Sequence, residues 1–333
     1  MSVSSSNSVQ NLADTPRVSI IILNWNGKAL LKKCLDSLKT RTAYKNYKIV
    51  VVDNGSSDNS SEMVTNRFPW VEIIPLTHNS GYPAGNNKGI AYALANHNPN
   101  YVLLLNNDTE TVQDNWLKRM VGVAESENNI GLVGCKLIRP DFSTQYLGTK
   151  ITIKGLSWLN PETNKVVPEI FEVDAILGAC FLIKKAVIDK IGFLDVGFSP
   201  FSDEESDFCM RAKKAGYKVL MASTVAVVHK GGASVDKIDS DYVTFVRRRN
   251  QIRFMLLNFP FSWLLARVPY EVRIFARCFI IKNLNRKRMF PLKLRSGMDM
   301  ISNLKINIYG WLCNIIGFRE ILRKRANRTF RLT

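Results

Sequence analysis

Short apolar runs, separated by polar turns and helical stretches, dominate the first 110 residues of the chain. Most of these runs consist almost entirely of Val, Ile and Leu, which is typical of parallel strands covered by helices on both faces of a sheet. Alternation of such strands with helices predicts a doubly wound α/β fold. The predicted strands are 18–23, 48–52, 71–76 and 101–105, and the predicted helices are 29–38 and 84–95.

Polar residues follow three of these four predicted strands. They are Asn24 to Gly27, Asp53 to Gly55 and Asn106 to Asp108. Because ligands of open α/β sheets bind beyond the carboxyl ends of the strands, the topology alone selects this edge of the sheet as the candidate site.

The pattern is less regular after residue 110. We expect strands at 130–138 and 219–228, a short helix at 186–191, and a hairpin or long loop over the site at 140–168. From Tyr242 onward the pattern changes to amphipathic helices. We expect breaks in these helices at Pro260, Pro269 and Pro291, because proline removes a helical hydrogen bond.

The net charge of +18 is concentrated at one end of the chain. Residues 245–333 hold 20 Lys and Arg against three acids, whereas the preceding 244 residues hold 26 basic and 25 acidic residues. A basic tail of this kind binds anionic lipid or nucleic acid. Its large aliphatic residues, such as Leu256 and Leu264, favour lipid, so we expect helices that lie in a membrane interface and no nucleic-acid partner.

Cysteine usage and the first sixteen residues bear on the compartment. The six cysteines form no CxxC pair, and residues 1–16, rich in Ser and Asn, lack the apolar core of a secretory signal. We therefore expect reduced, mostly buried thiols and a cytoplasmic protein, peripherally associated with the inner face of the cell membrane. The longest apolar stretch of the tail, 254–266, is too short to span a bilayer.

Asp53 is an acid at the end of an otherwise apolar predicted strand. A turn at Asn54-Gly55 and a capping-box spacing of Asn59 and Glu62 account for its neighbours in purely structural terms. A carboxylate at this position can also accept a hydrogen bond from the N3–H of a pyrimidine. From spacing alone, both interpretations stay open.

Four segments in order, VSIIILNWNG, VVDNGSSD, NSGYPAGNNKG and LLLNNDTE, resemble the donor-binding half of family 2 inverting glycosyltransferases, and their rhamnosyltransferase-like branch in particular. GACFLIKKAVIDKIGFLD, FSDEESDFCMR and VVHKGGAS extend the resemblance over about residues 17–250. It implies the GT-A fold, Rossmann-like with a mostly parallel central sheet flanked by helices, here followed by an amphipathic helical extension. It also implies inverting transfer of a sugar from dTDP-rhamnose or a UDP-sugar to a glycan or lipid-linked acceptor hydroxyl in cell-surface polysaccharide synthesis.

This resemblance divides the chain into four parts. We expect a disordered tail at 1–16, a nucleotide-sugar-binding half at 17–110, an acceptor-binding and catalytic half at 111–241, and a basic membrane-associating helical extension at 242–333. The segment Arg247-Arg248-Arg249-Asn250 resembles the Arg-Asn step that follows the catalytic domain in the rhamnosyltransferase-like branch.

The resemblance also assigns the donor site. It places Asp53 on the uracil or thymine ring and makes Asp108 and His229 ligands of Mg²⁺ or Mn²⁺, with Asn106 where many members have a second Asp. One carboxylate can suffice when the donor diphosphate adds oxygen ligands. Alternatively, Asp108 caps the next helix and His229 is structural. The other residues assigned to the nucleotide sugar are Asn24, Asn26, Asn54, Gly81, Asn86, Asn87 and Asn107.

The acidic cluster in FSDEESDFCMR provides the candidate base. An inverting transfer needs a carboxylate that takes the proton from the acceptor hydroxyl. Matching Asp207 and Arg211 to the family motif places Glu205 at the position of the usual Asp, and because Glu is longer, Glu204 or Asp203 can substitute for it. The structural alternative is a capping box with an ion pair between Asp207 and Arg211. Repulsion among four acids favours catalysis, with Glu205, Glu204 and Asp207 as candidates.

Small and aromatic residues in the second half of the chain are candidates for contacts with the acceptor. By resemblance, Gly178, Ala179 and Cys180 place small side chains beside the sugar or acceptor. The aromatic residues Trp158, Phe198 and Phe201 either stack on the acceptor or pack in the core.

Two rival functions stay open. One rival is a non-catalytic nucleotide- or carbohydrate-binding protein on a degenerate transferase scaffold. The other is a nucleic-acid-binding protein that acts through the basic tail.

Overall fold

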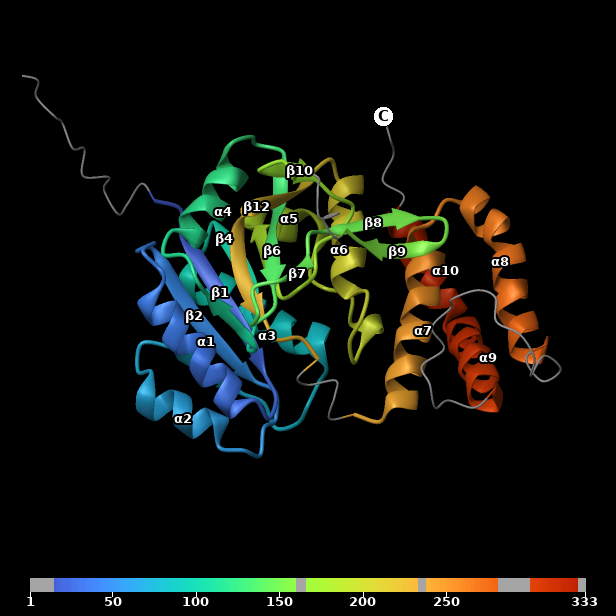
Figure 1. The fold of residues 1–333 in the computed structure, drawn as a ribbon, viewed down its shortest axis with the longest axis horizontal. Coiled ribbons are helices and arrows are strands. Elements are labelled where there is room, and N and C mark those ends of the chain that lie inside the picture. Colours follow the sequence, from blue (N-terminus) through green and yellow to red (C-terminus); the bar gives the residue numbers. More distant parts are fainter. Residues whose placement is uncertain (1–14, 160–165, 233–237, 281–299, 329–333) are drawn as a thin grey trace, which may run out of the picture.

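The computed structural model describes residues 15–159, 166–232, 238–280 and 300–328. The tail expected at 1–16 lies outside these residues except for its last two positions. Figure 1 shows an α/β unit on one side of the molecule and a group of helices, α7 to α10, on the other.

A mixed sheet forms the centre of the α/β unit, in the order β10-β12-β6-β11-β4-β1-β2-β3. The predicted parallel set is present: β1 (Val18–Asn24), β2 (Tyr47–Asp53), β3 (Glu72–Pro75) and β4 (Tyr101–Asn106). An antiparallel strand, β11 (Cys180–Lys184), joins this set to a second parallel pair, β6 (Ile130–Ile138) and β12 (Lys218–His229). Shorter antiparallel strands are β5 (Thr109–Thr111), β7 (Thr144–Tyr146) and β10 (Ile170–Glu172).

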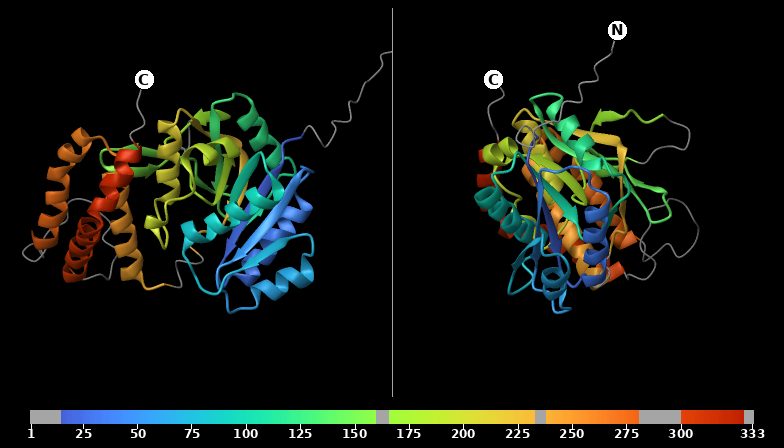
Figure 2. Two further views of the ribbon diagram at one scale, coloured as in Figure 1. Left: turned by 180° about the vertical axis from the view of Figure 1, so that it is seen from behind. Right: turned by 90° about the vertical axis from the view of Figure 1, so that its left-hand side faces the viewer.

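Helices cover both faces of the sheet, and α1 and α3 lie on opposite faces (Figure 2). In α1, Leu31, Leu35 and Leu38 are buried at the three-to-four-residue spacing of one helix face. In α3, Gly89 allows close approach to the sheet, since a Cβ there would lie 2.9 Å from Val52 Cγ2. The helices of this unit are α1 (Lys28–Thr40), α2 (Ser60–Arg67), α3 (Tyr82–His97), α4 (Trp116–Glu125), α5 (Lys185–Ile191) and α6 (Glu204–Lys214).

Strand register brings the polar strand ends together. Asn24 pairs with Asp53 across β1 and β2, and Leu23 pairs with Asn106 across β1 and β4. The predicted hairpin is present as β8 (Thr149–Thr152) and β9 (Gly155–Trp158), which form a small separate sheet.

The helical extension begins where the sequence pattern changes. It consists of α7 (Ser240–Asn258), α8 (Phe261–Ile280), α9 (Met300–Ile316) and α10 (Phe318–Arg328). The expected break at Pro260 is found between α7 and α8, and Pro291 lies outside the described residues. The expected break at Pro269 is wrong, because α8 continues through it. Arg267 bonds Glu271 (2.9 Å) and the carbonyl oxygen of Ile153 (2.6 Å), which stabilises the helix around the proline.

A second apolar core joins the extension to the α/β unit. It is formed by Phe198 of the α/β unit together with residues of α7, Phe259 and Ile321 of α10. Among the described residues, no helix is long and apolar enough to cross a membrane. Four of the cysteines, Cys34, Cys135, Cys180 and Cys209, are buried free thiols as predicted, whereas Cys313 is exposed.

Candidate active site

A cavity of about 530 Å³ opens at the carboxyl ends of β1 and β4. The loop after β12, the start of α6 and Arg247 in the third turn of α7 complete its wall. Among the candidate residues, its lining includes Asn54, Gly81, Asn107, Asp108, Glu205 and His229. The structure therefore brings together the predicted metal ligands and the predicted base, which are up to 121 residues apart in the chain.

Asn24 supports the cavity from behind. Its side chain is fully buried and does not line the cavity. Its amide nitrogen donates to Ser56 Oγ (3.2 Å), and its oxygen accepts from the amide of Asn107 (2.7 Å). Asn24 thus connects β1 to the turn after β2 and orients Asn107, which does line the cavity.

Asp53 and Asn26 order the turn after β2. One oxygen of the buried Asp53 carboxylate accepts from the amide of Ser56 (3.1 Å), and the other accepts from the Ser61 hydroxyl. Asn26 Oδ1 accepts from the amide of Ser57 (2.8 Å). Neither Asp53 nor Asn26 contributes to the cavity lining.

Asn54 holds the loop that leads into α3. Its oxygen accepts from the amide of Ser80 (2.9 Å), and its nitrogen donates to Asn79 Oδ1 (2.9 Å). Gly81 follows with φ +83°, and a Cβ there would lie 2.9 Å from Pro200 Cα. The next residue, Tyr82, donates its amide to the carbonyl oxygen of Pro200 (2.6 Å). Glycine at 81 therefore lets the donor-side loop contact the loop that precedes the acidic cluster.

The resemblance assigns Asn86 and Asn87 to the wall around the donor, and both lie in α3. Asn86 is buried and donates to the carbonyl oxygen of Tyr82 within α3 (3.0 Å). Asn87 exchanges two hydrogen bonds with the backbone of Leu194, at 2.9 and 3.1 Å. Neither side chain lines the cavity, because helix geometry directs both toward the protein interior. Their observed contacts fix α3 to the segment before α6.

Asp108 and His229 lie next to each other, since β5 and β12 pair with Thr109 opposite His229. Asp108 Oδ1 is 3.4 Å from His229 Nε2, and Asp108 Oδ2 accepts from the amide of Gly231 (3.1 Å). His229 Nδ1 is 2.8 Å from Gln145 Oε1, which can only accept. The other ring nitrogen, Nε2, is 3.4 Å from the Asn106 amide nitrogen as well as from the Asp108 carboxylate, so a neutral imidazole with its proton on Nδ1 presents the Nε2 lone pair on this side.

These two side chains fit an open cation site. A cation bound here would contact both the Nε2 lone pair of neutral His229 and the Asp108 carboxylate. Within the described ranges, no cluster of three or more His, Cys, Asp or Glu could hold a metal. The protein thus offers two ligands, which matches ions that take their remaining ligands from phosphate oxygens and water.

Glu205 occupies the first turn of α6 and faces the cavity. Burial raises the pKa of its carboxyl to about 7. Hydrogen bonds from the Gly178 amide and the Tyr82 hydroxyl lower this pKa, but by less than burial raises it. A carboxyl with this pKa exchanges protons readily at neutral pH. Of the three candidate catalytic acids, Glu205 is the one that lines the cavity.

Glu204 and Asp207 point elsewhere. Glu204 is buried outside the cavity lining, and its Oε2 has no hydrogen-bond partner among the described residues. Burial and the neighbouring Glu205 raise the pKa of Glu204 well above its usual value. Asp207 is fully buried and accepts from Arg211 (3.0 Å), Asn258 (2.8 Å) and Arg328. The structure therefore places Asp207 in a contact between α6 and the helical extension and away from the cavity.

Asn250 of α7 fixes the loop before α6, a role that sequence reasoning missed. Its buried amide nitrogen donates to the carbonyl oxygens of Phe198 (2.5 Å), Phe201 (2.7 Å) and Ser202 (3.1 Å). Arg249 adds a hydrogen bond to the carbonyl oxygen of Ser199. The Arg-Asn step was the only signal of this role, and it does not reveal which loop the two side chains bind.

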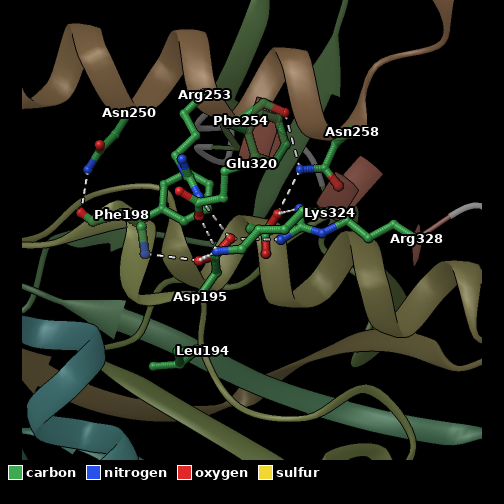
Figure 3. A network of polar contacts seen from close by, with 12 residues as sticks. Leu194, Asp195, Phe198, Asn250, Arg253, Phe254, Asn258, Glu320, Lys324 and Arg328 are labelled. Atoms are coloured by element: carbon green, nitrogen blue, oxygen red, sulfur yellow. Dashed lines mark hydrogen bonds and ion pairs between the residues drawn. The ribbon is translucent and has the colours of Figure 1, made fainter. Parts of the chain in front are cut away.

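Asp195 anchors α10 to the α/β unit (Figure 3). Its carboxylate contacts Lys324 (2.7 Å), Arg328 (2.9 Å) and Arg253 (3.4 Å). Burial works against ionisation, but Lys324 and Arg253 lower the pKa of Asp195 to about 2. Nothing in the sequence marked this residue, because its partners lie up to 133 residues away.

The three aromatic candidates divide between the cavity and the core. Trp158 is 56% exposed and lines the cavity, as does Phe201. Phe198 is fully buried in the second core, with the Arg253 guanidinium 5.5 Å from its ring centroid. Trp158 and Phe201 therefore remain available to a ligand, and Phe198 does not.

Comparisons with known proteins agree with this architecture. The family model "Glycosyl transferase family 2" matches residues 19–192. The O-antigen biosynthesis protein RfbC of Myxococcus xanthus is 27% identical over 232 residues, which cover 66% of this chain and 18% of RfbC. The N-acetylglucosaminyl-diphospho-decaprenol L-rhamnosyltransferase of Mycobacterium tuberculosis is 21% identical over 309 residues, covering 85% of this chain and 99% of that protein.

The chain thus spans about a fifth of the length of RfbC. Among solved structures, GalNAc-T7 with UDP, GalNAc and Mn²⁺ superposes with a TM-score of 0.60 at 15% identity, covering 89% of this chain and 55% of that chain. At this level of identity the likeness concerns the fold. Because the family model covers more than half of the chain, the protein belongs to glycosyl transferase family 2 and has the GT-A fold.

Proposed function

We propose that the protein is an inverting glycosyltransferase that moves a sugar from a nucleoside-diphosphate sugar to a hydroxyl of a lipid-linked glycan. One observation carries the proposal: Glu205, whose pKa is raised to about 7, faces the same cavity as the pair Asp108 and His229. A proton acceptor and a cation site in one cavity are the two elements that an inverting transfer needs.

The donor binds at the strand ends. Asp108 and His229 would hold Mg²⁺ or Mn²⁺, and such an ion neutralises the charge that develops on the leaving nucleoside diphosphate. Lys230, the residue after His229, lines the same wall and adds positive charge. Asp53 would bind the pyrimidine, because each carboxylate oxygen has a second lone pair beyond its bond to Ser56 or Ser61. Asn54, Gly81 and Asn107 shape the cavity between the base and the diphosphate.

Glu205 takes the proton of the acceptor hydroxyl. The hydroxyl oxygen forms a bond to the anomeric carbon while the bond from that carbon to the diphosphate oxygen breaks, and the proton passes to the Glu205 carboxylate. The Gly178 amide and the Tyr82 hydroxyl orient this carboxylate by hydrogen bonds. Attack from the side opposite the leaving group inverts the anomeric centre.

The acceptor side combines aromatic and membrane-facing features. Trp158 and Phe201 would stack on the acceptor sugar. The extension exposes large apolar residues and carries most of the excess positive charge, a combination that binds anionic membranes. We propose that it rests on the inner face of the cell membrane. The most exposed of these residues are Phe261 (69%), Val272 (59%), Ile315 (60%) and Ile316 (85%).

The Mycobacterium tuberculosis relative, whose name specifies a decaprenol-linked acceptor, supports this assignment of the acceptor. RfbC, named for O-antigen biosynthesis, supports a place in cell-surface polysaccharide synthesis. The donor sugar is proposed from the rhamnosyltransferase-like motifs as dTDP-rhamnose or a UDP-sugar.

Nucleotide binding and transfer test the proposal together. We expect UDP or dTDP, but not GDP or CDP, to raise the melting temperature, and to do so only with Mn²⁺ or Mg²⁺ present. Glu205→Gln should abolish transfer and keep this nucleotide shift. Glu169→Gln, which neutralises an exposed acid outside the cavity, is the matched control. A Glu205→Gln variant with full transfer activity would point to another base, whereas nucleotide binding without any transfer by the wild type would favour the non-catalytic binding protein.

A further inference from the structure

A second cavity, of about 400 Å³, lies between the α/β unit and α10. The end of α5, the segment 193–196, the last turn of α6 and α10 form its wall. It shares no lining residue with the candidate active site. Glu205 and Lys214 lie nine positions apart on α6, which corresponds to about 14 Å along a helix. The two cavities are therefore at opposite ends of α6.

Basic side chains dominate the lining of this second cavity. Three acids, Asp195, Asp207 and Glu320, form ion pairs with three of the five basic residues. Figure 3 shows Asp195 among its basic partners. The cavity therefore carries an excess of two positive charges over these acids. The paired basic residues are Arg211, Lys324 and Arg328, and the other two are Lys190 and Lys214.

Lys190 and Lys214 meet at the same wall of the cavity. Lys190 donates to the carbonyl oxygen of Ala215 (2.8 Å) and lies over the ring of Tyr217. Ala215 is the residue after Lys214 in the chain. Lys214 is exposed, and within the described ranges it makes no hydrogen bond and no ion pair. Both ammonium groups thus lack an acidic partner among the described residues.

Other cations surround Lys214. Burial lowers its pKa, Arg328 and Arg325 lower it further, and the more weakly felt charge of Asp207 acts in the opposite direction. The negative end of the α6 dipole favours a basic residue in the last turn, but two other basic residues already occupy that turn. A lysine beside two arginines is destabilised by like charge, and an anion in the cavity would offset this repulsion.

We propose that the second cavity binds a phosphate group that belongs to neither the sugar donor nor the acceptor. The inference goes beyond the proposed function, because it adds a separate ligand site. A phosphate carries up to about two negative charges and several acceptor oxygens, which suits the two ammonium groups and the nearby guanidinium of Arg328. The group belongs either to soluble phosphate or to the headgroup of an anionic phospholipid. Bound there, it would contact α5, α6 and α10 together.

Thermal melts of the full chain with inorganic phosphate test the soluble source. A chelator keeps divalent ions away from Asp108 and His229, and chloride at equal ionic strength controls for screening. We expect phosphate to raise the melting temperature of the wild type, and Lys214→Gln to weaken phosphate binding about tenfold. Lys39→Gln is the matched control, because Lys39 is also exposed in the last turn of a helix, α1. It should bind phosphate as the wild type does.

Flotation with phosphatidylcholine vesicles, with and without phosphatidylglycerol, tests the lipid source. Lys214→Gln should weaken the phosphatidylglycerol-dependent part of binding about tenfold, and Lys39→Gln should not. An effect of Lys214→Gln in one experiment alone identifies the source of the phosphate. An effect in both shows that the cavity accepts either source.

The stability of the ligand-free protein separates a binding site from a structural role. Lys214→Gln removes a repelled charge, so without phosphate or vesicles it should melt no lower than the wild type. A lower melting temperature would assign Lys214 a structural role and overturn the inference. The absence of a Lys214-specific effect in both binding experiments would also overturn it. Failure of the proposed function is distinct, because it appears as absence of Glu205-dependent transfer, whatever the phosphate affinity.

Discussion

A Cβ atom on Gly178 would lie 2.9 Å from the carboxyl carbon of Glu205 and closer still to its Oε1. The backbone at 178 is not in the left-handed region, so conformation is not the reason for glycine here. Glycine is required because the Glu205 carboxylate and the Tyr82 hydroxyl occupy the space of a side chain, and the carboxylate accepts a hydrogen bond from the amide of Gly178 itself. Gly178 and Glu205 are thus matched in size to one another, although they lie on different elements.

Gly178→Ala should displace the Glu205 carboxylate and lower kcat by at least about tenfold, since small misplacements of a catalytic group are costly. The melting temperature should change little, because the carboxylate can move toward the open cavity. Gly122→Ala in α4 is the control, because nothing lies within 4 Å of its added Cβ. A kcat for Gly178→Ala equal to that of the wild type would contradict the proposed role of Glu205.

The pH dependence of transfer should report the Glu205 carboxyl. Its ionised form is the base, so kcat/KM should rise with pH through about 7. Tyr82→Phe removes a hydrogen bond that lowers this pKa, so the rising limb should move to higher pH. Tyr309→Phe, at an exposed position of α9, should leave the profile unchanged. If the Tyr82→Phe profile shifts to lower pH instead, the hydrogen bond from Tyr82 does not lower the pKa of Glu205.

Asp195→Asn should destabilise the fold by about 1–3 kcal/mol, because Arg253, Lys324 and Arg328 lose a shared anion, although each keeps a second one in Glu320 or Asp207. The pKa of Asp195 is lowered to about 2, so its stabilising effect is complete above the unfolded pKa of about 3.9 and is lost as the pH falls through about 2. Urea unfolding at pH 7 should therefore separate variant from wild type, and the difference should shrink toward pH 2. Asp189→Asn, which removes an exposed pair with Lys185, should cost less than about 1 kcal/mol.

Asn250→Ala should release the loop before α6 and lower kcat, since three backbone carbonyl oxygens lose a buried donor. We expect about 1–3 kcal/mol of lost stability. Asn96→Ala, which removes one exposed hydrogen bond within α3, is a matched control. Circular dichroism melts and initial rates would measure both effects, and an unchanged kcat would show that the loop does not depend on Asn250.

Membrane binding can be measured by flotation of the full chain with vesicles. We expect binding to vesicles with anionic lipid, weakened by salt and by the double change Ile315→Glu and Ile316→Glu at two exposed positions of α9. The double change Thr65→Glu and Asn66→Glu, at two exposed positions of α2 outside the extension, adds the same negative charge and is the control. If RNA binds the protein tightly and displaces it from the vesicles, the nucleic-acid alternative is favoured.

The periodicity of the chain was sufficient to predict the parallel strands and the edge at which the polar residues meet. The strand prediction is confirmed because buried parallel strands need continuous apolar runs. The ends of neighbouring parallel strands meet because the strands pair in register, as Asn24 and Asp53 do. The family motifs added the acidic cluster and the pair Asp108 and His229, which the structure brings into one cavity.

Sequence by itself therefore determined the element types, the site edge and the set of candidate acids. Only the tertiary structure decided which of those acids faces the cavity. The rotation of α6 directs Glu205 to the cavity and Asp207 to Arg328, and packing against α10, more than 120 residues away, contributes to that rotation. Likewise, Asn87 and Asn250 became structural side chains because of the backbone groups they contact. Local spacing records the face on which a residue lies, but not the partner that the folded chain brings to that face.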